Sequence, residues 1–165
     1  MRRTILLTAV AIMAVSAFAF AAAKPNFSGA WTMDRARSFG LPADMTQTLT
    51  VSQKEDRIEL ETKLIQPNNE RTVKDTYVLD GKEYDFTPVV PPNQPPATGK
   101  RTATWLPGDK GIQVTDVTTA ETPKGPVKTQ TVRKWTLSGE GELVVDMYVD
   151  NPNISYEAKR IFIKQ

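Results

Sequence analysis

Hydrophobic and polar residues alternate along much of this chain, and the alternation is clearest over residues 57–65. Apolar side chains and one threonine occupy every second position there, with charged side chains between them. The first set is Ile58, Leu60, Thr62 and Leu64, and the second is Arg57, Glu59, Glu61 and Lys63. Because successive side chains of a β-strand point to opposite faces, this pattern predicts a strand that separates a hydrophobic core from water.

Ten segments of this kind follow one another at short intervals. Turn residues separate them, and the chain after residue 23 shows no sustained helical periodicity. Asp80-Gly81 predicts a hairpin between the fourth and fifth strands, with a type I′ turn that needs positive φ at both positions. The predicted strands cover residues 30–34, 46–53, 57–65, 71–79, 82–86, 100–106, 111–119, 127–137, 142–150 and 154–163.

Short strands joined by tight turns predict an antiparallel up-and-down meander. A meander of this length usually closes on itself, since closure removes the exposed strand edges. The predicted fold class is therefore all-β, a single barrel of about 8–10 strands that occupies residues 24–165. Residues 35–44 contain Gly40 and Pro42 and predict a loop with room for one helical turn.

The segment 88–96 interrupts the strands in the middle of this domain. It contains five prolines, each of which lacks a backbone N–H donor, so it is not an internal strand. We interpret it as an exposed loop or rim segment. A domain boundary is the alternative, although neither half of the chain alone has enough strands to close a barrel.

Residues 1–23 have the three-part pattern of a secretory signal peptide. Two arginines provide a positive start, an apolar stretch covers residues 5–20, and alanines at 21–23 offer a cleavage site. We therefore expect a mature domain in the periplasm or outside the cell, with no stable membrane anchor after cleavage. An uncleaved anchor is the alternative, because the apolar stretch approaches the length that spans a membrane.

Composition excludes several kinds of site. The chain has no cysteine and no histidine, which excludes disulfides, Cys or His zinc sites, and Ser-His-Asp or Cys-His catalysis. Without the two leader arginines, 19 basic and 19 acidic residues remain, and no basic stripe with interleaved aromatics occurs. We therefore expect no nucleic-acid partner, no metal and no cofactor.

Two short segments carry a resemblance to a known superfamily. Residues 27–31 read FSGAW and open the first strand, and residues 158–163 read AKRIFI and close the last. This pairing resembles the calycin superfamily, which contains lipocalins, fatty-acid-binding proteins and bacterial lipocalin-like proteins. The resemblance implies that Trp31 plugs one end of the barrel and that Arg160 packs over its indole. It also places Phe162 where the fatty-acid-binding branch has a tyrosine that helps to grip a carboxylate.

The candidate ligand-binding residues combine this resemblance with the phase of the strands. They are Trp31, Tyr77, Trp105, Arg133, Arg160 and Phe162. Arg160 is in phase with Phe162, and Arg133 with Trp135, so both arginines are expected to face inward. A buried arginine needs a partner, which for Arg160 is either a bound anion or the Trp31 ring. For Arg133 the sequence leaves open Asp75, Asp116, a bound anion, or exposure near a rim.

These features support more than one function. The first is an exported barrel that binds a small hydrophobic or amphipathic ligand, in which a carboxylate would lack one hydroxyl donor because Phe162 replaces the tyrosine. The alternative is a non-enzymatic interaction or structural barrel whose interior is filled by its own side chains. An enzyme is the third possibility, but no spacing of acidic residues singles out a catalytic pair, and we predict no catalytic residue.

Overall fold

The computed structural model describes residues 23–90 and 96–165, so the expected leader and part of the proline-rich segment lie outside the described residues. Ten strands and one short 3-10 helix, η1 (Pro107–Asp109), make up the domain. The strands are β1 (Gly29–Met33), β2 (Thr46–Lys54), β3 (Arg57–Gln66), β4 (Asn69–Val78), β5 (Glu83–Phe86), β6 (Ala97–Trp105), β7 (Gly111–Thr122), β8 (Gly125–Leu137), β9 (Leu143–Asn151) and β10 (Ile154–Lys164).

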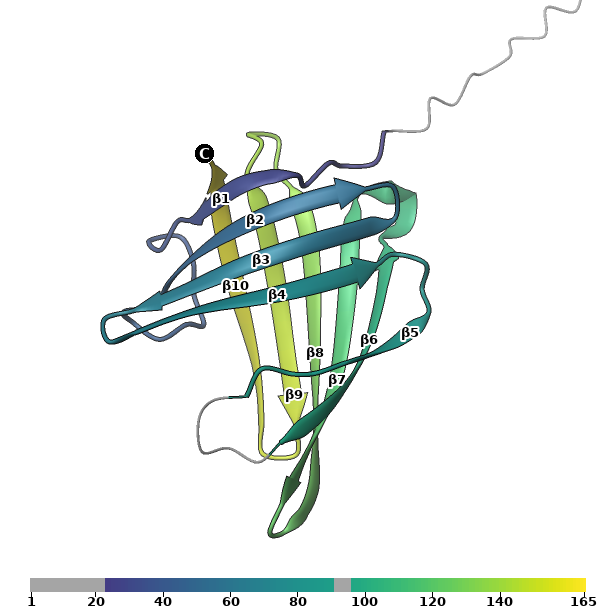
Figure 1. Ribbon diagram of the computed structural model, residues 1–165. Helices are drawn as coiled ribbons and strands as arrows, with labels where there is room; N and C mark the ends of the chain where they lie inside the picture. The colour runs from purple at the N-terminus through teal and green to yellow at the C-terminus, as the bar shows by residue number, and fades with distance from the viewer. Residues whose placement is uncertain (1–22, 91–95) are drawn as a thin grey trace, which may run out of the picture.

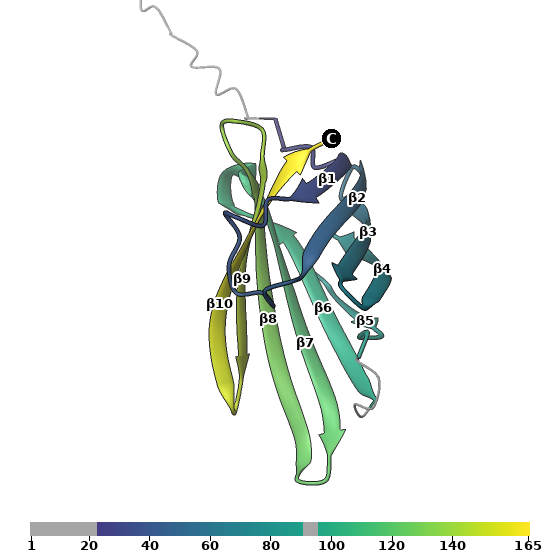
Figure 2. The ribbon, with the colours of Figure 1, turned by 90° about the vertical axis from the view of Figure 1, so that its left-hand side faces the viewer.

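All ten strands belong to one antiparallel sheet, in the order β4-β3-β2-β1-β10-β9-β8-β7-β6-β5. The first strand pairs with the last, so β1 and β10 lie side by side within the sheet. Figures 1 and 2 show β2–β4 crossing over β6–β10, which folds the sheet onto itself and encloses a core. The predicted all-β meander is therefore confirmed, and the observed strands agree with the predicted ones to within a few residues.

The predicted hairpin at Asp80-Gly81 is wrong. Among the described residues, β4 and β5 form no ladder; β5 pairs with β6 instead, and β4 and β5 are the two ends of the sheet. Gly81 has a positive φ of 74°, but Asp80 does not. The Asp80 carboxylate accepts hydrogen bonds from the Lys82 N–H and the Tyr84 hydroxyl, and the Gly81 N–H donates to Ala103 of β6. The two bonds to Asp80 order the turn, and the Gly81 bond holds it against β6, so the chain does not fold back along β4.

The core lies between the two crossing parts of the sheet. Side chains from the strands and from the segment before β1 are fully buried there, among them Phe27, Trp31, Ile58, Ile112, Leu143 and Phe162. The Trp135 ring meets the rings of Phe27 and Tyr77 edge-on, at centroid distances of 5.9 and 5.8 Å. The alternation over residues 57–65 is confirmed, since the predicted apolar face of β3 is buried or half-buried.

Two connections were predicted from the sequence, at residues 35–44 and 88–96. Residues 35–44 form a loop, as predicted, which the Arg35 guanidinium holds together by donating to backbone carbonyls of that loop. Residues 88–90 of the proline-rich segment are outside any strand, and residues 91–95 lie outside the described part of the chain. At the start of β7, Gly111 passes close to the backbone of β8, where a Cβ would lie 2.2 Å from the Trp135 carbonyl oxygen.

In the described ranges, no helix is long and apolar enough to cross a membrane.

Candidate functional site

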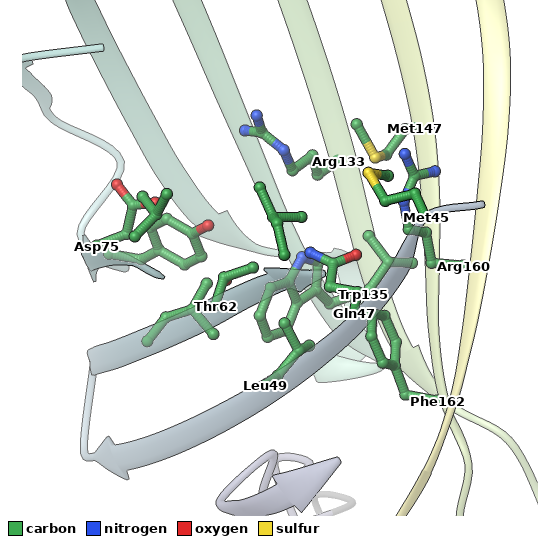
Figure 3. Close-up of a pocket in the computed structure, with 15 residues that line it drawn as sticks. Met45, Gln47, Leu49, Thr62, Asp75, Arg133, Trp135, Met147, Arg160 and Phe162 are labelled. Carbon is green, nitrogen blue, oxygen red and sulfur yellow. The ribbon is translucent and has the colours of Figure 1, made fainter. Parts of the chain in front are cut away.

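The concave side of the sheet encloses a partly open cavity of about 210 Å³ (Figure 3). Strands β2, β3 and β4 provide one wall, and β8, β9 and β10 provide the other. The wall is mainly apolar, with a few polar and charged side chains. The lining residues are Met45, Gln47, Leu49, Leu60, Thr62, Leu64, Val73, Asp75, Tyr77, Arg133, Trp135, Val145, Met147, Arg160 and Phe162.

Strand register explains why two arginines share this cavity. Arg133 of β8 lies opposite Met147 of β9, and Arg160 of β10 lies opposite Val145, the residue two positions before Met147. Residues opposite each other across a ladder point to the same face. The inward phase of Arg160, Met147 and Arg133 therefore brings all three side chains to one region of the wall, as Figure 3 shows.

Arg133 is part of an ion-pair network that continues behind the cavity. Its Nη1 lies 2.7 Å from Asp116 Oδ2, which confirms one of the two carboxylates predicted as its partner. Asp116 also binds Arg101 of β6 through both carboxylate oxygens, at 2.7 and 2.9 Å. Arg101 in turn lies 2.7 Å from Asp75, and its guanidinium stacks on the Tyr77 and Phe86 rings. This network pairs two arginines with two aspartates, so its charges balance.

Burial and charge act in opposite directions on the groups of this network. Burial alone would raise the pKa of Asp116, but hydrogen bonds and charge from Arg101 and Arg133 outweigh it and hold that pKa below its ordinary value. For Tyr77, burial outweighs the opposing charges of Arg133 and Arg101 and raises the pKa to about 12. Asp116 is therefore a buried carboxylate that stays ionised, and Tyr77 stays neutral over the physiological range.

Arg160 is in a different position from Arg133. Its Nη1 is buried and has no hydrogen-bond partner among the described residues. Burial lowers the pKa of Arg160, and the nearby charges of Arg133 and Arg35 lower it further. Arginine nevertheless remains protonated in proteins, so Arg160 places an incompletely paired positive charge in the cavity.

Two other lining residues also carry buried polar atoms without a partner in the described chain. They are Trp135, through its indole Nε1–H, and Gln47, through its side-chain oxygen. Buried polar groups are nearly always hydrogen-bonded in native proteins, because leaving one unpaired costs about 1–3 kcal/mol. Together with Arg160 they give the cavity two donors and one amide, and the amide can donate or accept according to its orientation. The group that would complement the two donors is a hydrogen-bond acceptor, preferably an anion.

The sequence-based candidates divide into two groups. Tyr77, Arg133, Arg160 and Phe162 line the cavity. Trp31 is only 2% exposed and belongs to the core outside the cavity lining, and its indole N–H donates to the Phe27 carbonyl at 2.9 Å. Trp105 is also outside this lining, where its indole N–H binds Asp56 at 2.9 Å and Lys24 lies over its ring.

The prediction that Arg160 packs over Trp31 is wrong. The cation over that ring is Lys164, whose Nζ lies 5.4 Å from the ring centroid. The register explains this, because Trp31 lies opposite Lys164 in the β1–β10 ladder. Arg160 lies earlier on β10, opposite Val145 of β9. Arg160 is thereby left facing the cavity.

Two polar residues that matter to the site, Arg101 and Gln47, were not named in the sequence analysis. Arg101 is 7% exposed and central to the ion-pair network, and Gln47 lines the cavity. The alternation of the strands could have assigned both to the interior, since Gln47 is in phase with Leu49 and Arg101 is in phase with the buried Ala103. No group of three or more potential metal-ligating side chains gathers within residues 23–90 and 96–165.

Comparison with known proteins gives only a distant likeness. No protein-family model matches the chain, and no curated protein matches it in sequence. Among solved structures, it is similar to the fatty-acid-binding protein isolated from Manduca sexta, with 15% sequence identity and a TM-score of 0.43. That match covers 85% of this chain and 100% of the other. A proposal for the ligand must therefore rest on the chemistry of the cavity.

Proposed function

We propose that this protein is a calycin-like barrel that binds a small amphipathic molecule with an acidic head group. The observation that carries the proposal is that Gln47, Trp135 and Arg160 each have a buried polar atom without a partner, and all three line one cavity. A ligand acceptor placed among them would satisfy the two donors. The apolar remainder of the ligand would lie against the leucine-rich wall of β2 and β3.

The size of the cavity limits what it can enclose. An apolar cavity of about 150 Å³ is enough for one benzene molecule, so a space of about 210 Å³ fits a head group and a short apolar segment. A longer chain would extend through the open side. Each Å² of apolar ligand surface removed from water contributes about 25 cal/mol, so affinity is expected to rise with chain length only until the wall is covered.

The two arginines are expected to contribute unequally. Arg133 is already neutralised by Asp116, whereas Arg160 has an unpaired donor. Phe162 lacks the hydroxyl of the tyrosine that helps to grip a carboxylate in the fatty-acid-binding branch, which on its own predicts little discrimination between a fatty acid and its alcohol or ester. With Arg160 facing the cavity, we expect a clear preference for an acid over the corresponding alcohol or ester.

Competition with an environment-sensitive dye tests this function. Anilinonaphthalene sulfonate would be bound to the purified protein and displaced by octanoic acid, octanol or methyl octanoate. A charge-assisted hydrogen bond is worth about 1.5–3 kcal/mol, so the acid should displace the dye at roughly 10- to 100-fold lower concentration than octanol. Arg160→Met should remove that preference and leave octanol binding unchanged. Lys164→Met removes a cation outside the cavity lining and is the matched control.

A barrel filled by its own side chains is the second candidate. The network of Asp75, Arg101, Asp116 and Arg133 occupies part of the interior and satisfies itself, which favours a structural role for that part. Failure of both dye and octanoic acid to bind the folded protein would favour this alternative. Equal displacement by the acid, alcohol and ester would instead show that the cavity binds apolar chains without selecting the head group.

We further propose that the protein is exported and that residues 1–23 are removed. Support comes from the arginine start, the apolar stretch and the alanines of the leader. N-terminal sequencing of the protein from the periplasmic or secreted fraction should give a start near Lys24. A start at Met1 in a membrane fraction would show that the leader is an anchor.

A further inference from the structure

Strand β4 is one end of the sheet, and within residues 23–90 and 96–165 it pairs with one strand only, β3. Figure 1 shows its beginning, together with the end of β3, projecting at the side of the molecule. An edge strand presents unpaired backbone N–H and C=O groups, which can accept another strand. Which of its residues do so follows from the ladder with β3.

The Leu79 N–H donates to the Asp56 carbonyl at 2.7 Å, which makes these two residues a hydrogen-bonded pair in register with the β3–β4 ladder. Hydrogen-bonded and non-hydrogen-bonded pairs alternate along an antiparallel ladder. Every second residue before Leu79 is therefore also hydrogen-bonded to β3, and these are the odd-numbered residues of β4. Glu70, Thr72 and Lys74 therefore direct their backbone N–H and C=O groups toward the free edge.

The side chains of the same residues form a self-complementary pattern. Glu70, Thr72 and Lys74 are exposed, and they alternate with the half-buried Arg71 and Val73. When two copies of β4 run antiparallel about a two-fold axis at Thr72, Glu70 of each copy lies opposite Lys74 of the other. An axis at Glu70 or at Lys74 would instead place identical charges opposite each other. Opposite charges facing across a ladder stabilise it, and like charges destabilise it.

The free part of β4 ends where the strand approaches β6. Asp75 is held by Arg101 of β6 at 2.7 Å, and the Gly81 N–H donates to Ala103 of the same strand at 3.0 Å. The segment available for pairing is therefore 70–74, which is the segment that carries the complementary charges.

We propose that β4 is a dimerisation edge, at which two copies of this chain join antiparallel about Thr72. In this arrangement Thr72 exchanges backbone hydrogen bonds with Thr72 of the second copy, and Glu70 does so with Lys74 of the second copy. The side chains extend the charge ladder across the axis, because Glu70 already contacts Lys63 at 2.8 Å and Lys74 contacts Glu61 at 3.2 Å. A short ladder of this kind gives a reversible dimer whose population depends on concentration. The proposal is independent of the ligand that the cavity binds.

Charge complementation tests the register directly. The purified protein should show reversible self-association in sedimentation velocity as its concentration is raised. Glu70→Lys alone, or Lys74→Glu alone, places like charges opposite each other twice and should weaken association by about tenfold. A mixture of the two variants restores both opposite-charge pairs and should form heterodimers. Glu59→Lys changes the same charge on the neighbouring strand β3 and is the matched control.

A backbone variant tests the strand pairing independently of charge. Thr72→Pro removes an N–H that faces the free edge and not β3, so the fold should survive while dimerisation is lost. Thermal unfolding of the variant checks that the domain is folded. The proposal is overturned by a protein that stays monomeric at every concentration, or by variants whose mixture does not associate. It is equally overturned if Glu59→Lys weakens the dimer as much as Glu70→Lys, or if folded Thr72→Pro dimerises normally.

Discussion

Replacement of Arg160 by methionine should stabilise the ligand-free protein, although it removes a side chain of the proposed binding site. Its buried Nη1 has no partner in the described chain, and an unsatisfied buried donor costs about 1–3 kcal/mol. Arg160 as a whole is only half-buried, so we expect the lower part of that range, about 1–2 kcal/mol. Methionine keeps most of the apolar stem and adapts well to irregular cavities.

The matched substitution Arg133→Met should instead lower the stability of the ligand-free protein. Arg133 pairs with the buried Asp116 at 2.7 Å, and removal of one member of a buried pair leaves an uncompensated charge at a cost of about 3–5 kcal/mol. Asp116 retains both hydrogen bonds from Arg101, so we expect Arg133→Met to destabilise by less, about 1–3 kcal/mol. The two variants remove the same group from the same cavity, and only the pairing of that group differs.

Thermal and urea unfolding of delipidated protein measures both effects. Each kcal/mol shifts the Tm of a domain of this size by roughly 3–4 °C, so Arg160→Met should melt about 3–8 °C above the parent protein. Bound ligand must be removed first, because it stabilises the parent protein in proportion to the logarithm of its concentration. In saturating octanoic acid the order should reverse. A ligand-free Arg160→Met that is less stable than the parent protein would refute the claim that Arg160 is unsatisfied.

Three further outcomes follow from the described contacts. Trp31→Ala should cost about 3–5 kcal/mol in urea unfolding, and a double-mutant cycle should show coupling of about 0.5–1 kcal/mol with Lys164→Met but none with Arg160→Met. Because the folded-state pKa of Asp116 is depressed, its stabilisation is complete above its unfolded value of about 3.9 and is lost as pH falls through the folded value. Asp116→Asn should therefore lose stability less steeply in acid, and parallel pH profiles would contradict this. Gly111→Ala should destabilise by about 1–3 kcal/mol, since its Cβ would lie 2.2 Å from a backbone oxygen of β8; an unchanged Tm would show that the strands can separate there.

Alternation along the chain was sufficient to predict the strands and the face on which each side chain lies. A period of two decides whether a residue points inward as soon as one neighbour is known to be buried. This is why Tyr77, Arg133, Arg160 and Phe162 could be assigned to the interior from sequence, and why Gln47 and Arg101 could have been assigned in the same way. The local signal is strong because a one-residue shift would expose the whole apolar face of a strand.

Pairing between strands was decided only by the tertiary structure. Asp80-Gly81 has the residues of a hairpin, yet the fold places this turn against Ala103, so β5 joins β6 and leaves β4 as an edge. The choice of Asp116 as the partner of Arg133 depends on the register of β7 and β8. The choice of Lys164 over Arg160 as the cation on Trp31 depends in the same way on β1 and β10. Alternation predicts the face on which a charged side chain lies. The partner of that side chain is on a strand distant in sequence, and the register of the folded sheet determines which residue the partner is.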